Sequence, residues 1–475
     1  MTKVGMVSLG CPKNLVDSEV MLGMLARQGY ELTPRAEEAE VIIVNTCAFI
    51  APAQRESIDT ILEMAEYKKS GSARKLVVAG CLVERYRQEI LKEIPEVDFV
   101  IGTNELEGVL EACGKDGHDR SFAGGAEPYL YHDYTPRLLT TPSYSAYLKI
   151  AEGCDHPCSF CVIPQMRGRF RSRPFASVVR EAENLARQGV AELTIVGQDT
   201  TSYGEDLGLR DGLASLLSEL GKIPELVWVR FLYSYPNRLT DALIAAVAET
   251  AKVAKYIDLP LQHASAPVLK LMRRGSNGEH FLRLIGRIRA AIPEVTLRTS
   301  FIVGFPGETE EDFQQLLDFV EAAQFDHLGV FLYSNEETSA SYMLPCHVPA
   351  RVADRRKRKL MAVQRGISRR KLRQKVGRAF PVLVEGRCEE TELLFQGRLE
   401  SQAPGIDGQV LINDFEGAEP RPGEFRWATL TAAGDYDLVA RLEARTFAER
   451  AVPSSPLPLA SRLVQIQPAA LSAST

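Results

Sequence analysis

The chain has 475 residues, a net charge of −6 and 45% hydrophobic residues, values that are ordinary for a globular protein. No run of about 18 apolar residues indicates a membrane-spanning helix, and the first residues lack the pattern of a secretory signal, so we expect a cytoplasmic protein with no membrane partner. At roughly 150 residues per domain the length predicts about three domains, and the acidic balance does not favour an obligate nucleic-acid binder.

The first predicted domain, residues 1–136, alternates strands with helices. Three short runs rich in β-branched residues predict buried parallel strands, at residues 4–9, 41–45 and 75–79. Apolar residues recur at helical spacing over residues 17–28 and 53–69. This alternation predicts a parallel α/β sheet, and the Gly- and charge-rich stretch 115–128 predicts a loop.

The second predicted domain, residues 140–350, repeats the alternation six times. Its strand candidates are residues 146–150, 192–196, 228–232, 256–261, 296–303 and 327–333. Helical patterns separate them, for example over residues 177–188 and 309–322. Six β/α units in a row predict a complete or partial barrel, in which an active site forms at the carboxyl ends of the strands.

Residues 351–375 form a strongly basic segment, which we predict to be a helical linker. It carries twelve Lys or Arg residues and a single acidic residue, Asp354. Apolar residues such as Leu360 and Ile367 recur at roughly helical spacing, which predicts an amphipathic helix. A charge run is usually a solvated helix face, but this one could instead contact rRNA or tRNA, or dock on acidic parts of the same chain.

Short strands with Gly and Pro turns over residues 376–447 predict a small antiparallel β-barrel. This region holds seven Arg, no Lys and thirteen Asp or Glu residues. An RNA-binding module is expected to be basic, whereas an acidic module attracts basic proteins, so the charge favours a protein substrate over tRNA. The last residues, 448–475, are rich in Pro, Ser and Ala and predict a flexible tail.

The chain has nine cysteines. An odd number in a cytoplasmic protein argues against a disulfide framework and leaves thiols available as metal ligands. Cys154, Cys158 and Cys161 form a C-x3-C-x2-C pattern directly after the first predicted barrel strand. Three thiolates on one loop can hold three irons of a 4Fe-4S cluster and leave the fourth iron open. The alternative is a zinc site with His156 or a distant residue as the fourth ligand.

A second set of cysteines follows the three N-terminal strands. Cys11, Cys47 and Cys81 each come just after one of these strands, and the carboxyl ends of parallel strands meet at the ligand-binding edge of an open sheet. Gly10 and Gly80 allow the close backbone approach that a cluster requires. We predict a second cluster here, again with one open iron; the alternative is three buried cysteines that act as small apolar residues. We predict structural or incidental roles for the remaining cysteines, Cys113, Cys346 and Cys388.

The C-x3-C-x2-C spacing, with the aromatic Phe160 before its last cysteine, resembles the signature of the radical S-adenosylmethionine (SAM) superfamily. The resemblance implies that the amino and carboxylate groups of SAM chelate the open iron, and that an electron from the cluster cleaves SAM to a 5′-deoxyadenosyl radical. It also implies that Phe160 flanks the adenine. The segment 302–307, which contains Gly304, fits a barrel strand and turn near the cofactor, although a generic tight turn explains its glycines equally well.

The two triads, in this order and followed by a β-module, resemble the methylthiotransferases from Lys3 to about Phe447. The resemblance is carried by residues 8–19 (SLGCPKNLVDSE), 45–47 (NTC), 80–82 (GCL) and 151–154 (AEGC). The residues after Cys11, with 198–200 (QDT) and 259–263 (LPLQH), resemble the RimO-type branch, which modifies a ribosomal protein; the tRNA-modifying branch tends to have Gln-Met-Asn after that cysteine. The resemblance implies a TRAM domain at the C-terminus and, as substrate, an aspartate of protein S-twelve of the small ribosomal subunit, whose β-carbon receives the methylthio group.

The same resemblance implies two 4Fe-4S clusters, with SAM as both methyl donor and radical source. The six triad cysteines are then metal ligands and catalytic residues. Candidate contacts to SAM or substrate, at or near the rim ends of the predicted barrel strands, are Gln198, Asp199, Gln262, His263, Arg298 and Ser300. Phe160 and Gly304 are further candidates for cofactor binding. Arg298 could pair with a carboxylate of SAM or substrate in a bidentate way, and each of the polar candidates could instead be structural.

The implied partners, besides the ribosomal protein, are an electron donor such as flavodoxin or ferredoxin and a sulfur carrier. Three other functions are open on the sequence alone. They are a tRNA adenosine methylthiotransferase, a non-catalytic electron carrier or cluster scaffold, and a zinc-stabilised binding module.

Overall fold

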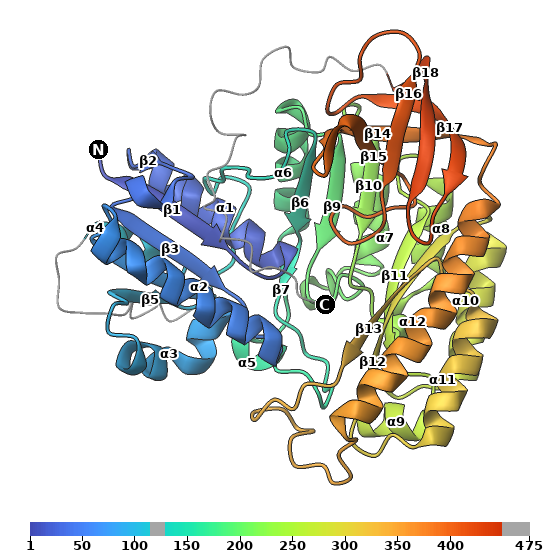
Figure 1. The fold of residues 1–475 in the computed structure, drawn as a ribbon, viewed down its shortest axis with the longest axis horizontal. Coiled ribbons are helices and arrows are strands. Elements are labelled where there is room, and N and C mark those ends of the chain that lie inside the picture. Colours follow the sequence, from blue (N-terminus) through green and yellow to red (C-terminus); the bar gives the residue numbers. More distant parts are fainter. Residues whose placement is uncertain (115–128, 449–475) are drawn as a thin grey trace.

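The computed structural model of the chain describes residues 1–114 and 129–448, which form three successive units (Figure 1). The loop expected at 115–128 and the tail expected at 448–475, except for its first residue, lie outside the described residues. In the part of the chain that is described, no helix is long and apolar enough to cross a membrane.

The N-terminal unit is a five-stranded sheet in the order β2-β1-β3-β4-β5, and all of its pairings are parallel. Its strands are β1 (Lys3–Ser8), β2 (Glu31–Leu32), β3 (Val41–Thr46), β4 (Lys75–Gly80) and β5 (Phe99–Ile101). The three predicted strands are confirmed as β1, β3 and β4. The edge strands β2 and β5 have only two and three residues, too few to show a pattern in the sequence.

Helices cover both faces of this sheet (Figure 1). They are α1 (Pro12–Arg27), α2 (Ala51–Ser70), α3 (Cys81–Glu93) and α4 (Gly108–Gly114), with a short 3-10 turn, η1 (Ala36–Glu38). Alternate residues of β3 face opposite sides: Ile42 and Val44 pack with α2 and α3, whereas Val41 and Ile43 pack with α1 and α4. Because both faces are buried, the strands are continuous apolar runs rather than alternating ones.

The central unit contains six strands in two parallel sheets of three. One sheet holds β6 (Ser145–Lys149), β9 (Glu192–Val196) and β10 (Trp228–Phe231), and the other holds β11 (Tyr256–Gln262), β12 (Thr296–Val303) and β13 (His327–Leu332). All six predicted strands are confirmed to within one residue at each end. Where the sheets meet, the backbone N–H groups of Tyr233 and Ser234 donate hydrogen bonds to Asp258 at 2.9 and 3.2 Å. The strands therefore form a partial barrel.

Helices cover the outside of the partial barrel (Figure 1). They are α6 (Phe175–Arg187), α7 (Gly212–Leu220), α8 (Asp241–Glu249), α9 (Ala266–Leu271), α10 (Gly278–Ala291) and α11 (Glu310–Ala323). Apolar residues of these helices and outward-facing strand residues such as Leu193 and Leu297 form one buried cluster. Smaller elements are a hairpin of β7 (Ala151–Glu152) and β8 (Arg171–Ser172), the short helix α5 (Ile163–Arg167), and two 3-10 turns, η2 (Glu205–Leu207) and η3 (Pro236–Arg238).

The basic segment forms helix α12 (Ala350–Arg373), which lies against β13 and α11. Its apolar residues Leu360 and Ile367 are fully buried in the barrel cluster. Lys371 Nζ lies 2.6 Å from Asp326, and Arg356 lies 3.2 Å from Glu310. Part of the positive charge of this helix is therefore neutralised by acidic residues of the same chain.

The C-terminal unit is a closed barrel with strand order β14-β15-β16-β18-β17. Its strands are β14 (Ala379–Cys388), β15 (Thr391–Leu399), β16 (Val410–Phe415), β17 (Phe425–Ala433) and β18 (Leu438–Ala448). Four of the five pairings are antiparallel. The fifth, between β16 and β18, is parallel, and it closes a barrel whose sequence pattern predicts antiparallel strands.

The C-terminal barrel is docked on the central unit. Arg398 of β15 donates to the carboxylate of Glu192 on β9 at 2.6 Å, and both side chains are buried. The segment 400–407 after β15 reaches the first residues of β11 and β13, because Tyr256 donates to Asp407 at 2.7 Å and the ring of His327 bonds to the backbone carbonyl of Ser401 at 2.9 Å. This segment covers the amino ends of those strands, opposite the end where an active site is expected.

Candidate active site

The three N-terminal cysteines lie together at the carboxyl edge of the first sheet. Cys11 immediately precedes α1, Cys47 directly follows β3, and Cys81 is the first residue of α3, directly after β4. The register aligns these strand ends, because Ser8 is opposite Asn45 and Thr46 is opposite Gly80. The predicted convergence of the three thiols therefore has a geometric basis in the sheet.

Two glycines let the cysteine loops approach one another. Gly10 has φ +86°, and a Cβ at this position would lie 2.6 Å from the Cβ and 2.9 Å from the Sγ of Cys47. Gly80 has φ +95°, and a Cβ there would lie 2.3 Å from the side-chain oxygen of Asn45. Only glycine tolerates both the backbone conformation and this contact.

Polar side chains after Cys11 fix these loops in place. Asn14 donates to the backbone carbonyl groups of Leu9 at 2.8 Å and Thr46 at 3.3 Å. Asn45 in turn donates to the hydroxyl of Ser18 at 2.8 Å. These hydrogen bonds tie the loop that carries Cys11 to the loop that carries Cys47.

The electrostatics of the first triad differ between its cysteines. Burial raises the pKa of Cys81 to about 12 and also raises that of Cys47. Burial opposes the thiolate of Cys11 too, but the positive charges of Lys13 and Arg167 outweigh it, so the pKa of Cys11 is lowered. Three free thiols, tightly approaching loops and two neighbouring cations fit an anionic iron–sulfur group, whose binding displaces the thiol protons.

The second triad lies on the loop between β7 and α5. The N–H of Cys161 bonds to the carbonyl of Cys158 at 3.1 Å, and Arg274 donates to the Sγ of Cys158 at 3.6 Å. Burial raises the pKa of both Cys154 and Cys161 to about 12. The loop is tight, because a Cβ at Gly153 would lie 2.1 Å from the carbonyl oxygen of Arg169.

Two observations bear on the zinc alternative. Within residues 1–114 and 129–448, no three His, Cys, Asp or Glu side chains are grouped as ligands of a single metal ion. In an iron–sulfur cluster each thiolate binds a different iron, so a triad can hold a cluster without converging on one point. His156, the proposed zinc ligand, instead bonds through Nε2 to Asp199 at 2.6 Å and stacks on Tyr235 with ring centroids 3.7 Å apart.

A buried ionic network joins the domains that carry the two triads. Arg167 of α5 donates to Asp17 of α1 at 2.5 Å. Lys149 of β6 donates to the same Asp17 and, at 2.7 Å, to Glu152. Gln198, which follows β9, donates to the same Glu152 at 2.7 Å. The network runs from the barrel rim to the helix that starts at the first triad.

One short segment after β10 contacts residues next to both triads. The ammonium of Lys13, two residues after Cys11, lies 3.3 Å from the ring centroid of Tyr233. Two residues further on, Tyr235 lies under the guanidinium of Arg274 at 4.4 Å, and Arg274 also contacts Cys158. Neither tyrosine was predicted to lie at the site, because no motif marks them and only the fold brings them there.

Several of the predicted contact residues form hydrogen bonds with other residues of the chain. Asp199 accepts hydrogen bonds from His156, from the backbone of Thr201 at 2.9 Å and from Ser202 at 2.7 Å. His263 is fully buried, and its Nδ1 accepts from the backbone N–H of Ser265 at 3.0 Å. Both carboxylate oxygens of Asp199 are therefore engaged, whereas Nε2 of His263 lies 3.6 Å from Glu308 and has no hydrogen-bond partner among the described residues.

Arg298 does not lie near the rim, contrary to expectation, while Ser300 is the fifth of the eight residues of β12. Arg298 is the third of eight residues in β12 and is paired in register with His327, the first residue of β13. Its guanidinium donates to Asp258 at 2.9 Å and lies 3.6 Å from Asp407 of the C-terminal unit. The guanidinium of Arg298, which was predicted to bind a carboxylate of SAM or substrate, is therefore already paired with carboxylates of the chain itself.

The remaining candidates lie at strand ends or in the core beside the second triad. Gln262 is the last residue of β11 and has φ +72°. Phe160 packs against the buried cluster of Val268, Met272 and Phe305. Gly304 has φ +81°, and a Cβ there would lie 2.6 Å from the Cβ of Ala353, so the close approach of α12 is enough to explain this glycine.

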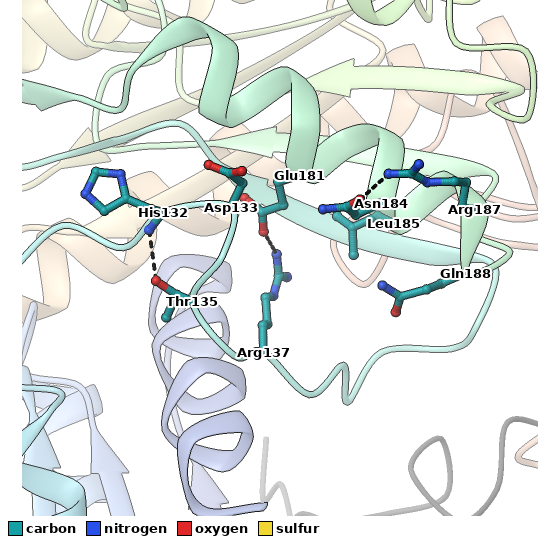
Figure 2. Close-up of a pocket in the computed structure, with 9 residues that line it drawn as sticks. All are labelled: His132, Asp133, Thr135, Arg137, Glu181, Asn184, Leu185, Arg187 and Gln188. Atoms are coloured by element: carbon teal, nitrogen blue, oxygen red, sulfur yellow. Dashed lines mark hydrogen bonds and ion pairs between the residues drawn. The ribbon is translucent and has the colours of Figure 1, made fainter. Parts of the chain in front are cut away.

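A separate pocket of about 400 Å³ lies beside α6 (Figure 2). It is lined by His132, Asp133, Thr135, Arg137, Glu181, Asn184, Leu185, Arg187 and Gln188. Figure 2 shows Arg137 reaching Glu181, a bond of 2.7 Å. No triad cysteine and no predicted contact residue lines this pocket, so it is distinct from the candidate active site.

Three family models match the chain, one over each structural unit. "Uncharacterized protein family UPF0004" matches residues 3–102, "Radical SAM superfamily" matches residues 148–320, and "TRAM domain" matches residues 376–442. The second of these models covers the loop of Cys154, Cys158 and Cys161.

Curated relatives are similar to the chain over nearly its full length. It is 60% identical to the ribosomal protein uS12 methylthiotransferase RimO of Solibacter usitatus, over 96% of this chain and 97% of the relative. It is 56% identical to the protein of the same name from Koribacter versatilis, over 93% of this chain and 96% of the relative. Among solved structures, the radical S-adenosylmethionine methyltransferase TsrM of Kitasatospora setae is 15% identical, with a TM-score of 0.53 over 77% of this chain and 89% of that one. At this identity the likeness is one of fold alone.

Proposed function

Since the chain belongs to the RimO family of ribosomal protein uS12 methylthiotransferases, we propose that it attaches a methylthio group to the β-carbon of an aspartate of uS12. The enzyme is a radical SAM transferase. Three details are also proposed: which residues bind the metal, that the enzyme uses two clusters, and which carbon is modified.

The observation that carries the proposal is the pairing of two cysteine triads across one domain boundary. Cys11, Cys47 and Cys81 are the proposed ligands of one 4Fe-4S cluster, and Cys154, Cys158 and Cys161 are those of the other. When bound, the clusters and SAM supply a sulfur atom, a methyl group and a carbon-centred radical. A radical is required because the target C–H bond is not acidic, so no side-chain base could readily remove its proton.

The residues of the chain bind and orient these groups and keep water away. Arg274 donates to the Sγ of Cys158, which stabilises charge on that sulfur. Asp17, Glu152 and Arg167 are all buried, and they hold the first triad against the barrel with charge-assisted hydrogen bonds. A dry, fixed boundary protects a reactive radical from side reactions.

Charge supports a protein substrate rather than tRNA. The C-terminal barrel has seven basic and thirteen acidic residues over 376–447, and proteins that bind rRNA are typically basic. Some basic residues of helix α12 form ion pairs with Asp326 and Glu310. The positive charge of this helix is therefore weaker evidence for RNA binding than its sequence suggests. Three partners stay predictions. They are rRNA, in contact with the remaining basic residues of the helix, an electron donor such as flavodoxin or ferredoxin, and a sulfur carrier.

Mass spectrometry of a deletion strain tests the function. We expect uS12 to lose the mass of one methylthio group at a single aspartate, tRNA to be unchanged, and the chain supplied in trans to restore uS12. Loss of a modified tRNA base with normal uS12 would reject the proposal in favour of the tRNA-modifying branch. Purified, reduced protein should also release 5′-deoxyadenosine from SAM; a non-catalytic cluster carrier would not.

A further inference from the structure

The loop that follows β13, at the bottom of Figure 1, begins with residues 334–341 (SNEETSAS). We call these residues the bridging loop. It contains no large apolar side chain, yet Glu336, Ser339 and Ser341 are buried. Loops normally run over the surface, and buried polar groups need hydrogen-bond partners. The bridging loop is therefore held in place by specific hydrogen bonds and not by apolar packing of its own.

One end of the bridging loop is bound to the N-terminal unit. The carboxylate of Glu336 lies 2.7 Å from Arg85 of α3, and both side chains are almost fully buried. Arg85 also donates to the backbone carbonyl of Ala48, directly after Cys47, at 2.8 Å. Because α3 begins at Cys81, this one guanidinium connects Glu336 to the segments that carry two cysteines of the first triad.

The other end of the bridging loop is bound to the loop of the second triad. The backbone N–H of Ser341 donates to the carbonyl of Ser159, directly after Cys158, at 2.8 Å. Gln165 of α5, the helix that follows this triad, donates to the carbonyl of Thr338 at 2.6 Å. One short loop therefore makes hydrogen bonds to the segments that carry both triads.

The N-terminal unit is thus attached to the partial barrel at both of its edge strands, β6 and β13. At the first edge, Lys149 of β6 donates to Asp17 of α1. At the second edge, the bridging loop makes the attachment. A single link would leave the N-terminal unit free to turn about it, whereas two links at opposite edges fix its orientation over the barrel.

We propose that the bridging loop sets the position of the first triad relative to the second, with Glu336 as a positioning residue, and so couples SAM cleavage to transfer of the methylthio group. This inference rests on the proposed function, in which one substrate side chain has to reach both triads. A misplacement of about 1 Å can slow a positioned reaction by about 100-fold. If the first triad is displaced, SAM is still cleaved but transfer fails, so the two products are no longer formed in proportion.

Two measurements on the purified, cluster-loaded enzyme test this role. The first is backbone hydrogen exchange in peptides that cover Cys47 and the bridging loop, which needs neither SAM nor turnover. The second is the amount of methylthiolated uS12 formed per 5′-deoxyadenosine when SAM and uS12 are supplied. Both are compared between the wild type, Glu336→Gln, Gln54→Ala and the matched control Glu337→Gln.

The variants separate positioning from folding. Gln54 of α2 donates to the carboxylate of Glu336 at 2.8 Å, so Gln54→Ala weakens the same attachment without leaving a buried charge unpaired. It keeps the test decisive if Glu336→Gln does not fold. Glu337 is the exposed neighbouring carboxylate of the same loop. Fewer folded or cluster-loaded molecules would lower both products together and leave their ratio unchanged.

We expect Glu336→Gln to raise hydrogen exchange in both peptides and to lower the product ratio by about 10-fold or more. Gln54→Ala should change both in the same direction by less, and Glu337→Gln should match the wild type. An unchanged ratio, or unchanged exchange at Cys47, in both Glu336→Gln and Gln54→Ala overturns the positioning role while the proposed function stands. A wild type that cleaves SAM but does not modify uS12 overturns the proposed function instead.

Discussion

Arg167 Nη1 lies 2.5 Å from Oδ2 of Asp17, and both side chains are buried between the N-terminal sheet and the barrel. Arg167 also donates to Asn14 at 3.1 Å and lies near enough to lower the pKa of Cys11. One guanidinium therefore joins the two domains and stabilises negative charge at the first triad.

Replacing Arg167 with Met should destabilise the protein strongly. The carboxylates of Asp17 and Glu152 would stay buried with less compensation, and breaking a buried pair in this way costs about 3–5 kcal/mol. Urea unfolding measures the change. The control is Arg180→Met, which removes an exposed arginine paired with Asp133 and should have much less effect; equal effects in the two variants would contradict the structural role of Arg167.

Gly10→Ala should remove the N-terminal cluster and spare the other. The new Cβ would lie 2.6 Å from the Cβ of Cys47, so the loops of Cys11 and Cys47 must separate. The matched control is Gly29→Ala: Gly29 has nearly the same φ, +84°, but nothing lies within 4 Å of the position that its new methyl group would take. Iron analysis should show a loss of about half in Gly10→Ala and none in Gly29→Ala. A loss in both would mean that backbone strain, not crowding at Cys47, is responsible.

Arg398→Met should undock the C-terminal barrel from the central unit. Arg398 donates to Glu192 at 2.6 Å and to Glu385 at 2.7 Å, and it is almost fully buried. Trp228 packs edge-on against Phe425 across this interface, with ring centroids 4.9 Å apart, so its fluorescence reports docking once Trp427 is replaced by Phe. Arg387→Met, which removes an exposed pair with Glu419 on the same barrel, should leave the fluorescence unchanged.

Docking should also depend on pH through Glu192. Burial alone would raise the pKa of Glu192, but Arg398 and Arg230 outweigh it and lower the pKa to about 2. A carboxyl with a lowered pKa contributes stability that is complete above its unfolded value, near 4.5, and is lost as the pH falls towards 2. The same Trp228 signal should therefore change over this acid range in the wild type. Glu192→Gln should lack this dependence, and an identical acid transition in that variant would contradict the assignment.

The sequence predicted most of the fold because its elements carry strong local patterns. The six barrel strands, such as 192–196, are apolar runs of ordinary length and were located to within one residue. The strands β2 and β5 were missed because two or three residues carry no period. The parallel pairing of β16 with β18 was missed for a different reason: strand patterns show which residues form strands, but not which strands become neighbours.

The residues of the candidate site could likewise be predicted only where a local sequence pattern marks them. The triads were visible because cysteines recur at strand ends, and the sheet register explains why Cys47 and Cys81 meet. Arg298 was placed at the wrong end of β12, because an apolar run gives the extent of a strand but not which of its polar residues is near the rim. Tyr233 and Arg167 could not be predicted, since their roles depend on how the N-terminal sheet sits against the barrel.

The most direct test of the account is the iron and sulfide content of protein purified without oxygen, compared between the wild type, Cys11→Ala and Cys154→Ala. Two separate triads predict about eight irons in the wild type and about four in each variant, with Cys346→Ala, which changes an exposed cysteine outside both triads, unchanged at about eight. A wild type with about four irons, or with zinc and no sulfide, would contradict the central claim that each triad holds its own cluster.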